Sequence, residues 1–138
     1  MREILFRGQT RRKGEKVWMD GTPVESNWVY GGIFPGTGDF SVIYTVDPIE
    51  KRPVYSDTVG QFTGLTDKNG KKIFEGDICR VSRPCVLAYG KITFQNGCFW
   101  FVDDGPGGML RLCDAKMNGF EVDIIGNIHD NPELLTEK

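Results

Sequence analysis

Cysteine and histidine are the side chains of this sequence best suited to bind a metal ion or to act as nucleophiles. Cys79 and Cys85 lie six positions apart, and Cys98 and Cys113 lie fifteen positions apart. Structural zinc sites usually separate paired ligands by about two to four residues, so this spacing predicts no metal site. The single histidine, His129, has no nucleophile motif beside it, and we expect it to have a structural role. The sequence therefore predicts neither a metal nor a cofactor.

Neighbouring carboxylates are the second candidate for chemistry. Asp103 and Asp104 are adjacent, and Asp114 follows in the same region. Such a group could bind a divalent cation or serve a hydrolase as general acid and base. The first two residues border the glycine- and proline-rich run 105–108, however, where aspartate is a typical turn residue. We therefore predict that the protein is not an enzyme and has no small-molecule substrate, with a hydrolase kept as an alternative.

A basic cluster, Arg11-Arg12-Lys13, suggests a third possibility, which is binding of single-stranded nucleic acid. Small β-barrels often bind single strands by combining a basic groove with exposed aromatic rings. The formal net charge of −2 and the isoelectric point near 5.4 do not favour a general nucleic-acid-binding protein, so we keep this function as the alternative. The possible stacking residues are Trp18, Trp28 and Trp100.

These residues must be positioned by β-strands, because helical periodicity is nearly absent. Short runs of alternating apolar residues recur between turn residues, and the chain contains 18 glycines. This pattern predicts an all-β fold, either a barrel or a sandwich. Extended segments are expected at 2–7, 16–19, 27–34, 40–46, 53–56, 78–82, 86–95, 98–102, 109–113 and 121–128, with one helical turn at 131–135.

Two Asn-Gly pairs, Asn69-Gly70 and Asn96-Gly97, predict tight hairpin turns and hence strand register. A two-residue loop at the first turn predicts Asp67 opposite Lys72 and Leu65 opposite Phe74. The second turn predicts one apolar face with Ile92, Phe94, Phe99 and Phe101. It leaves Trp100 on the other face with Lys91 and Thr93. Aromatic residues dominate the energy of protein interfaces, so the candidate interaction surface comprises Trp100, Trp28, Tyr30, Lys91, Thr93, Arg11, Arg12 and Lys13.

The run 58–78, which includes the first Asn-Gly turn and Glu75-Gly76-Asp77-Ile78, closely resembles the signature of the YopX family. The segments 2–8, 17–19, 27–31 and 125–135 resemble other blocks of that family, in the same order. The family consists of small bacteriophage and prophage proteins with no established activity. The resemblance implies an SH3-like small barrel at 53–138 with a short C-terminal helical turn. Residues 1–52 would then be an N-terminal β extension, and we expect it to form one compact unit with the barrel.

The function predicted from these observations is a non-enzymatic phage accessory protein that acts through protein–protein contacts. The partner is expected to be a host or phage protein, or another copy of the chain in a homo-oligomer. No apolar stretch approaches the roughly 20 residues that cross a bilayer, and no signal peptide is evident. We therefore expect a cytoplasmic protein in the bacterial host, with no membrane partner and with reduced thiols.

Overall fold

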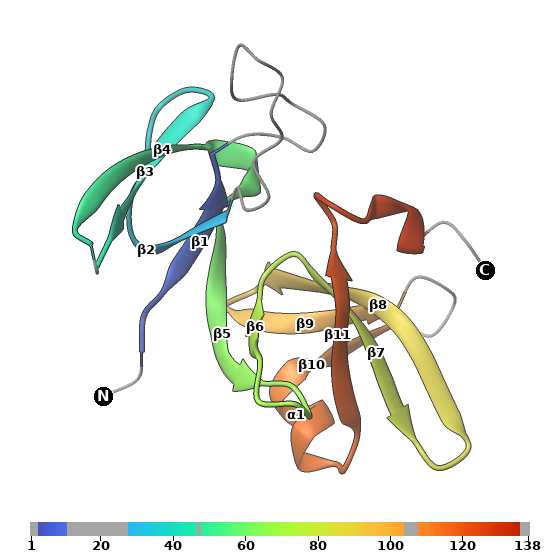
Figure 1. The fold of residues 1–138 in the computed structure, drawn as a ribbon. Coiled ribbons are helices and arrows are strands. Elements are labelled where there is room, and N and C mark those ends of the chain that lie inside the picture. Colours follow the sequence, from blue (N-terminus) through green and yellow to red (C-terminus); the bar gives the residue numbers. More distant parts are fainter. Residues whose placement is uncertain (1–2, 11–27, 47, 104–107, 136–138) are drawn as a thin grey trace. The chain divides into compact units, whose positions relative to one another are not determined.

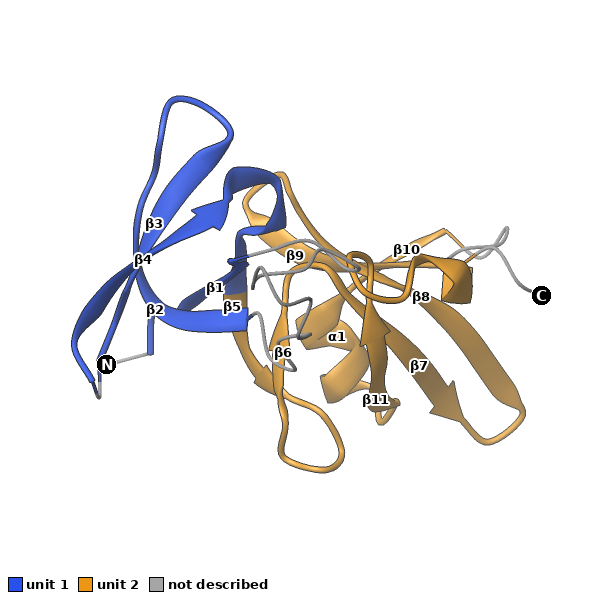
Figure 2. Ribbon diagram, turned by 45° about the horizontal axis from the view of Figure 1, so that its top comes forward, with its two compact units in different colours: residues 1–61 blue, residues 62–138 orange. Residues whose placement is uncertain are grey.

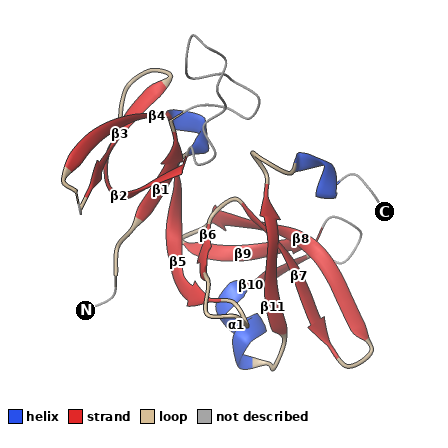
Figure 3. Ribbon diagram, in the orientation of Figure 1, coloured by secondary structure: helices blue, strands red, loops and turns tan. Residues whose placement is uncertain are grey.

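The computed structural model describes residues 3–10, 28–46, 48–103 and 108–135, and in these residues it is a β-protein with one short α-helix (Figure 1, Figure 3). The chain divides into two compact units, residues 1–61 and 62–138 (Figure 2). It passes from one to the other within strand β5 (Gly60–Thr66). The boundary expected from sequence was between residues 52 and 53. No helix in the described part of the chain is long and apolar enough to cross a membrane.

The first unit is an antiparallel sheet in the order β4-β3-β2-β1, followed by the first residues of β5. The strands expected at 27–34 and 40–46 are confirmed, while the first strand starts later than the predicted 2–7. The expected strand at 16–19 lies outside the described residues. A 3-10 turn, η1 (Ser56–Thr58), precedes β5. The strands are β1 (Phe6–Gln9), β2 (Trp28–Phe34), β3 (Phe40–Thr45) and β4 (Glu50–Tyr55).

One face of this sheet is the core of the first unit. Ile43 on β3 and Val54 on β4 are fully buried on it. Strands β1 and β4 are not neighbours in the sheet, yet a Cβ placed on Gly8 of β1 would lie 2.8 Å from Cγ2 of Val54. The sheet therefore curls until these two strands touch, and glycine at position 8 permits the close approach.

The second unit contains a five-stranded antiparallel sheet in the order β10-β9-β8-β7-β11. Its core includes Cys79, Val81, Ile92, Phe101 and Val122, all with at most 4% exposure. The remainder of β5 pairs with β6. The strands at 78–82, 86–95, 98–102 and 121–128 are confirmed within one or two residues. The elements are β6 (Lys72–Phe74), β7 (Asp77–Arg83), β8 (Val86–Gln95), β9 (Cys98–Asp103), β10 (Met109–Arg111), β11 (Glu121–Asn127) and the 3-10 turn η2 (Pro132–Leu135).

A helix replaces part of the extended segment expected at 109–113. Helix α1 (Leu112–Met117) begins directly after β10. It ends in a Schellman motif, in which Phe120 N–H donates to Ala115 O and Gly119 N–H to Lys116 O, with Gly119 at φ +82°. The short helix was missed because its six residues give little helical periodicity.

The hairpin turn at Asn96-Gly97 has the predicted register, with Thr93 opposite Trp100 and Phe94 opposite Phe99. Both turn residues have positive φ, at 52° and 77°, as a type I′ turn requires. This confirms which side chains share a face in β8 and β9.

The predicted register of the other hairpin is wrong. Asp67 N–H donates to Lys71 O, so the loop has three residues rather than two, and Thr66 pairs with Lys72. The Asp67 carboxylate accepts hydrogen bonds from the N–H groups of Asn69 and Lys71, which stabilises this wider turn. Phe74 then pairs with Phe62, because a second irregularity at Gly64, with φ +88°, shifts the register of β5 again.

The all-β class is confirmed. The described strands pair as two antiparallel sheets, and the SH3-like barrel remains a prediction. The C-terminal helical turn is confirmed as the 3-10 turn η2.

Candidate functional site

Four aromatic side chains share the face of the first unit's sheet that is opposite its core. Phe34 pairs with Val42, and Gly32 pairs with Tyr44, so alternation along β2 and β3 places these aromatic residues on one side. The buried Ile43 lies on the other side. We call this surface the aromatic face, and it comprises Tyr30 (45% exposed), Phe34 (64%), Phe40 (52%) and Tyr44 (41%).

Trp28 lies on β2, two residues before Tyr30, but is less accessible. Its ring is half-buried and packs against Arg7 of β1, whose guanidinium carbon is 4.5 Å from the ring centroid. Arg7 is itself only 7% exposed and pairs in register with Tyr30. Of the two predicted contact residues on β2, Tyr30 is therefore the more accessible to a partner, while Trp28 packs against Arg7.

Strand β4 adds a cation and a second aromatic contact to this surface. Lys51 is exposed and pairs directly with Tyr44. Tyr55 pairs with Phe40, and their ring centroids are 4.8 Å apart. Stacked neighbours restrict the rotamers of an exposed ring, which lowers the entropy lost when a partner binds.

Trp100, Lys91 and Thr93 lie on one face of the second unit's sheet, as predicted. Thr93 pairs with Trp100. Trp100 is half-buried, and its Nε1 donates a hydrogen bond to Gln95 O at 2.9 Å. The Thr93 hydroxyl oxygen is buried with no hydrogen-bond partner among the described residues. These residues belong to the second unit, whereas Trp28 and Tyr30 belong to the first.

Several predicted residues lie outside the described part of the chain. Arg11, Arg12 and Lys13 of the basic cluster are among them, as are Trp18 and Asp104. Their role stays a prediction.

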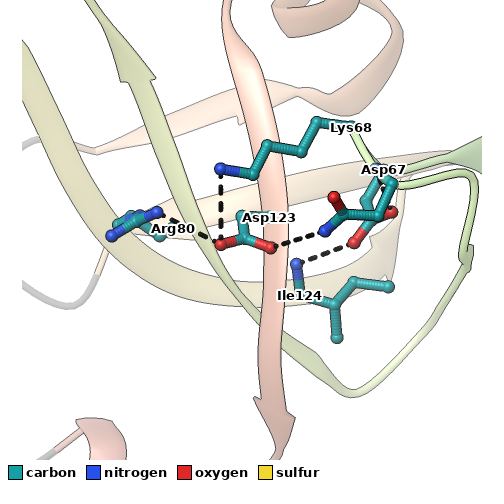
Figure 4. Close-up of polar contacts among 6 residues, drawn as sticks. Asp67, Lys68, Arg80, Asp123 and Ile124 are labelled. Carbon is teal, nitrogen blue, oxygen red and sulfur yellow. Dashed lines mark hydrogen bonds and ion pairs between the residues drawn. The ribbon is translucent and has the colours of Figure 1, made fainter.

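The turn of the family signature anchors the hairpin to β11. Besides the two N–H groups of its own turn, the Asp67 carboxylate accepts a hydrogen bond from the N–H of Ile124 at 3.2 Å (Figure 4). Lys68 N–H donates to Val122 O at 2.9 Å. Burial raises the pKa of Asp67, but the backbone N–H groups of Lys71, Ile124 and Asn69 outweigh it and the net pKa is lowered. The charged Asp67 carboxylate therefore has a structural role, as the acceptor of three backbone N–H groups.

Asp123 lies on β11 beside this turn. Its carboxylate is 3.2 Å from Nη2 of Arg80 and 3.8 Å from Nζ of Lys68 (Figure 4). It also accepts a hydrogen bond from Nδ2 of Asn69 at 3.4 Å. Arg80 and Lys68 are each more than a third exposed, so solvent weakens these ion pairs.

The signature's Glu75-Gly76-Asp77 step is also structural. Asp77 is 2% exposed, and its carboxylate accepts a hydrogen bond from the N–H of Phe74 at 2.8 Å. Gly76, with φ +91°, donates its N–H to Ile92 O and accepts from Ile128 N–H. These hydrogen bonds hold the start of β7 against β8 and against the C-terminal segment 125–135.

Two asparagine side chains stabilise the C-terminal segment 125–135 by local hydrogen bonds. The Asn127 Oδ1 accepts hydrogen bonds from the N–H groups of His129 and Asp130, and the Asn131 Oδ1 accepts one from Asn127 N–H. A Cβ on Gly126 would lie 2.6 Å from Asn131 Oδ1, which explains the glycine. These contacts give Asn127 and Asn131 a local structural role.

The residues considered for chemistry are dispersed. Cys79 is fully buried, which confirms it as a small core residue, while Cys85 and Cys113 are exposed and Cys98 is half-buried. Asp114 is bound to Arg111, 2.9 Å from its Nε, and this contact raises the pKa of Arg111. Among the described residues, no three Cys, His, Asp or Glu side chains form a group that could hold a metal ion.

Sequence reasoning missed three of the four residues on the aromatic face, Phe34, Phe40 and Tyr44. A signal was present, because aromatic residues recur at even spacings in both strands, from Trp28 and Tyr30 to Phe34 and from Phe40 to Tyr44. Such period-two spacing places them on one side of a strand. The core residues that occupy the opposite side had to be known before this side could be identified as exposed.

Comparisons with known proteins agree with this architecture. A family model described as YopX protein matches residues 14–136. The crystal structure of protein EF1440 from Enterococcus faecalis is similar over 98% of this chain and 99% of that chain, with a TM-score of 0.55 and 23% sequence identity. At this identity, the likeness concerns the fold alone. No curated protein matches the chain.

Proposed function

The chain belongs to the YopX family, and from this premise we propose that it is a non-enzymatic phage or prophage accessory protein. It works through protein–protein contacts in the bacterial cytoplasm, with a host or phage protein or another copy as partner. The observation that carries this proposal is the aromatic face of Tyr30, Phe34, Phe40 and Tyr44, each at least 41% exposed.

The chemistry of this surface supports contact with protein. Exposed apolar side chains that are scattered singly are common, but here four exposed rings lie on one side of two adjacent strands. Tyrosine is one of the residue types that most often contribute large binding energies. Further apolar side chains lie in the turn between β3 and β4, where Val46 is 73% and Ile49 is 85% exposed.

The roles of polar side chains in the signature and in the segment 125–135 support a function without catalysis. Asp67, Asp77 and Asn127 each accept hydrogen bonds from backbone N–H groups. A general base or nucleophile needs free access to a substrate. We therefore assign these residues to the scaffold, and the contact function to side chains outside the signature.

Co-purification of the tagged protein from its native cell tests the proposal. The double variant Phe34→Ser, Tyr44→Ser removes two rings from the aromatic face while leaving the opposite core face unchanged. We expect the wild type to retain a specific partner, identified by the mass of the intact complex, and the variant to lose it. The matched control is Met117→Ser, which removes an 83% exposed apolar side chain from α1. An identical partner profile for wild type and double variant contradicts the proposal.

A second candidate function is single-stranded nucleic-acid binding, favoured by Lys51 beside Tyr44 on the aromatic face. Rings and cations on one sheet surface can stack bases and contact phosphates. Affinity would then fall with salt, with a log–log slope of about −0.7 for each neutralised phosphate. Binding of a labelled oligonucleotide that is absent at low salt would eliminate this candidate.

A further inference from the structure

The chain contains three Asn-Gly pairs, and the structure places each of them in a different kind of turn. Asn69-Gly70 lies in the three-residue loop between β5 and β6. Asn96-Gly97 is the two-residue loop between β8 and β9. Asn118-Gly119 follows helix α1. An asparagine before glycine is prone to spontaneous loss of its side-chain amide, because glycine has no side chain to hinder attack by its own backbone nitrogen.

The nucleophile of this reaction is the backbone nitrogen of the glycine. It gives up its proton and forms a bond to the asparagine Cγ, while the bond from Cγ to Nδ2 breaks and the side-chain nitrogen leaves as ammonia. Water then adds to either carbonyl of the cyclic imide and opens it to aspartate or to isoaspartate. No oxidant or reductant takes part. A glycine N–H that donates a hydrogen bond must first release its acceptor, so such a bond slows the reaction.

In two of the three pairs, the glycine N–H donates such a hydrogen bond. Gly70 N–H donates to Asp67 O at 3.0 Å. Gly119 N–H donates to Lys116 O at 3.3 Å, within the Schellman motif that ends α1. The side chain of Asn69 is also held, because its Nδ2 donates to a carboxylate of β11 at 3.4 Å. Both of these turns must open before the glycine nitrogen can attack.

The pair Asn96-Gly97 lacks this protection. The loop closes through Gln95 and Cys98, which leaves the N–H groups of the two loop residues outside the pairing. In the described part of the chain, no carbonyl accepts the Gly97 N–H. Asn96 and Gly97 are both exposed, so water has access to the reacting groups. The nucleophile is therefore available without the opening of a backbone hydrogen bond.

We propose that Asn96 is a site of spontaneous deamidation, with water as the co-reactant, and that it reacts before Asn69 and Asn118. Each event adds one negative charge to a chain whose formal net charge is −2. Isoaspartate also adds one backbone carbon to the two-residue loop, so Gln95 and Cys98 no longer pair in the same geometry. The reaction involves no residue of the aromatic face and is independent of the proposed contact function.

Peptide mapping by mass spectrometry, after incubation of the folded protein in mildly alkaline buffer, measures the reaction at each asparagine. We expect Asn96 to react at least about fivefold faster than Asn69 and Asn118, the factor that corresponds to one backbone hydrogen bond. The rate should rise with pH, because the attacking nitrogen must lose its proton. In concentrated urea the three sites should react at similar rates, since the hydrogen bonds of Gly70 and Gly119 are then lost.

A glycine substitution separates this site from the other two. Asn96→Gly removes the reacting amide and keeps a sequence that suits a type I′ turn, so the acidic product seen by ion exchange should disappear. The matched control Asn118→Gly should form this product as fast as the wild type does. Thermal unfolding checks that both variants are folded, and the peptide map of the wild type does not depend on them.

Three results would overturn the proposal. The first is that Asn69 or Asn118 reacts before Asn96 in the folded protein, or that all three react at one rate. The second is that Asn96 stays intact in the folded protein while the chain in urea reacts. The third is that Asn96→Gly forms the acidic product as fast as the wild type does. Each result concerns the pure protein without a partner, so this proposal and the contact function can fail separately.

Discussion

The side chain of Asp67 accepts a hydrogen bond from the backbone N–H of Ile124, 57 positions further along the chain, at 3.2 Å. The same carboxylate accepts the N–H groups of Asn69 and Lys71 within its own turn. One residue therefore sets the width of the signature hairpin and anchors it to β11. These hydrogen bonds give Asp67 of the signature a structural role, and no catalytic role is needed to account for it.

Removal of the Asp67 carboxylate should destabilise the protein. We expect Asp67→Ala to lower the free energy of unfolding by about 2–3 kcal/mol, because hydrogen bonds to a charged acceptor are lost and the Ile124 N–H is left without its partner. Urea denaturation measures the change. Lys68→Ala, which removes only a partly exposed ion pair in the same turn, should change stability by less than about 1 kcal/mol. Equal effects of the two substitutions would contradict the structural role of Asp67.

The lowered pKa of Asp67 gives a direction for the pH dependence of stability. A carboxyl whose pKa is lower in the folded state stabilises the protein above its unfolded pKa of about 3.9 and loses this contribution as pH falls through the folded value. The stability difference between wild type and Asp67→Asn should therefore be constant near neutral pH and shrink below about pH 4. Urea titrations at several pH values measure it. A difference that grows on acidification would mean that the pKa is raised.

Two adjacent glycines in β2 should respond differently to alanine. A Cβ at Gly31 would lie 1.9 Å from the backbone oxygen of Tyr44, whereas a Cβ at Gly32 would have no atom within 4 Å. We expect Gly31→Ala to cost at least about 2 kcal/mol, since backbone must move, and Gly32→Ala to be nearly neutral. Thermal unfolding of the two variants checks this. Similar melting temperatures would show that β2 and β3 do not approach as closely as described.

The buried thiol of Cys79 offers another matched comparison. Cys79→Ser would place a hydroxyl in the apolar core of the second unit and should cost about 1–3 kcal/mol. Cys113 is exposed, so Cys113→Ser should leave the free energy of unfolding almost unchanged. Urea denaturation under reducing conditions distinguishes them, and a neutral Cys79→Ser would remove this residue from the core.

Much of the strand pattern could be predicted from sequence because alternation and turn residues are local signals. The hairpin at Asn96-Gly97 was predicted with its register, since a two-residue loop with two positive φ angles leaves one way to pair the strands. The hairpin at Asn69-Gly70 was not, because Asp67 stabilises a wider loop and contacts a strand that is distant in sequence. A local dipeptide signal cannot report such a contact.

The candidate surface was predicted less completely than the strands. Tyr30 was identified, and the face shared by Trp100, Lys91 and Thr93 is confirmed. The half-burial of Trp100 and Trp28 was missed. Trp28 packs against Arg7 of a different strand, and this contact arises only in the folded chain. Exposure of a ring is a tertiary property, and alternation alone gives only the side of the strand on which it lies.

Hydroxyl-radical footprinting of the complex that co-purifies with the protein tests the central claim most directly, because it reports the accessibility of individual aromatic side chains. The account predicts that Tyr30, Phe34, Phe40 and Tyr44 react in the free protein and are protected in the complex. Met117 should react equally in both states. Unchanged reactivity of all four rings in the complex would contradict a contact function for the aromatic face.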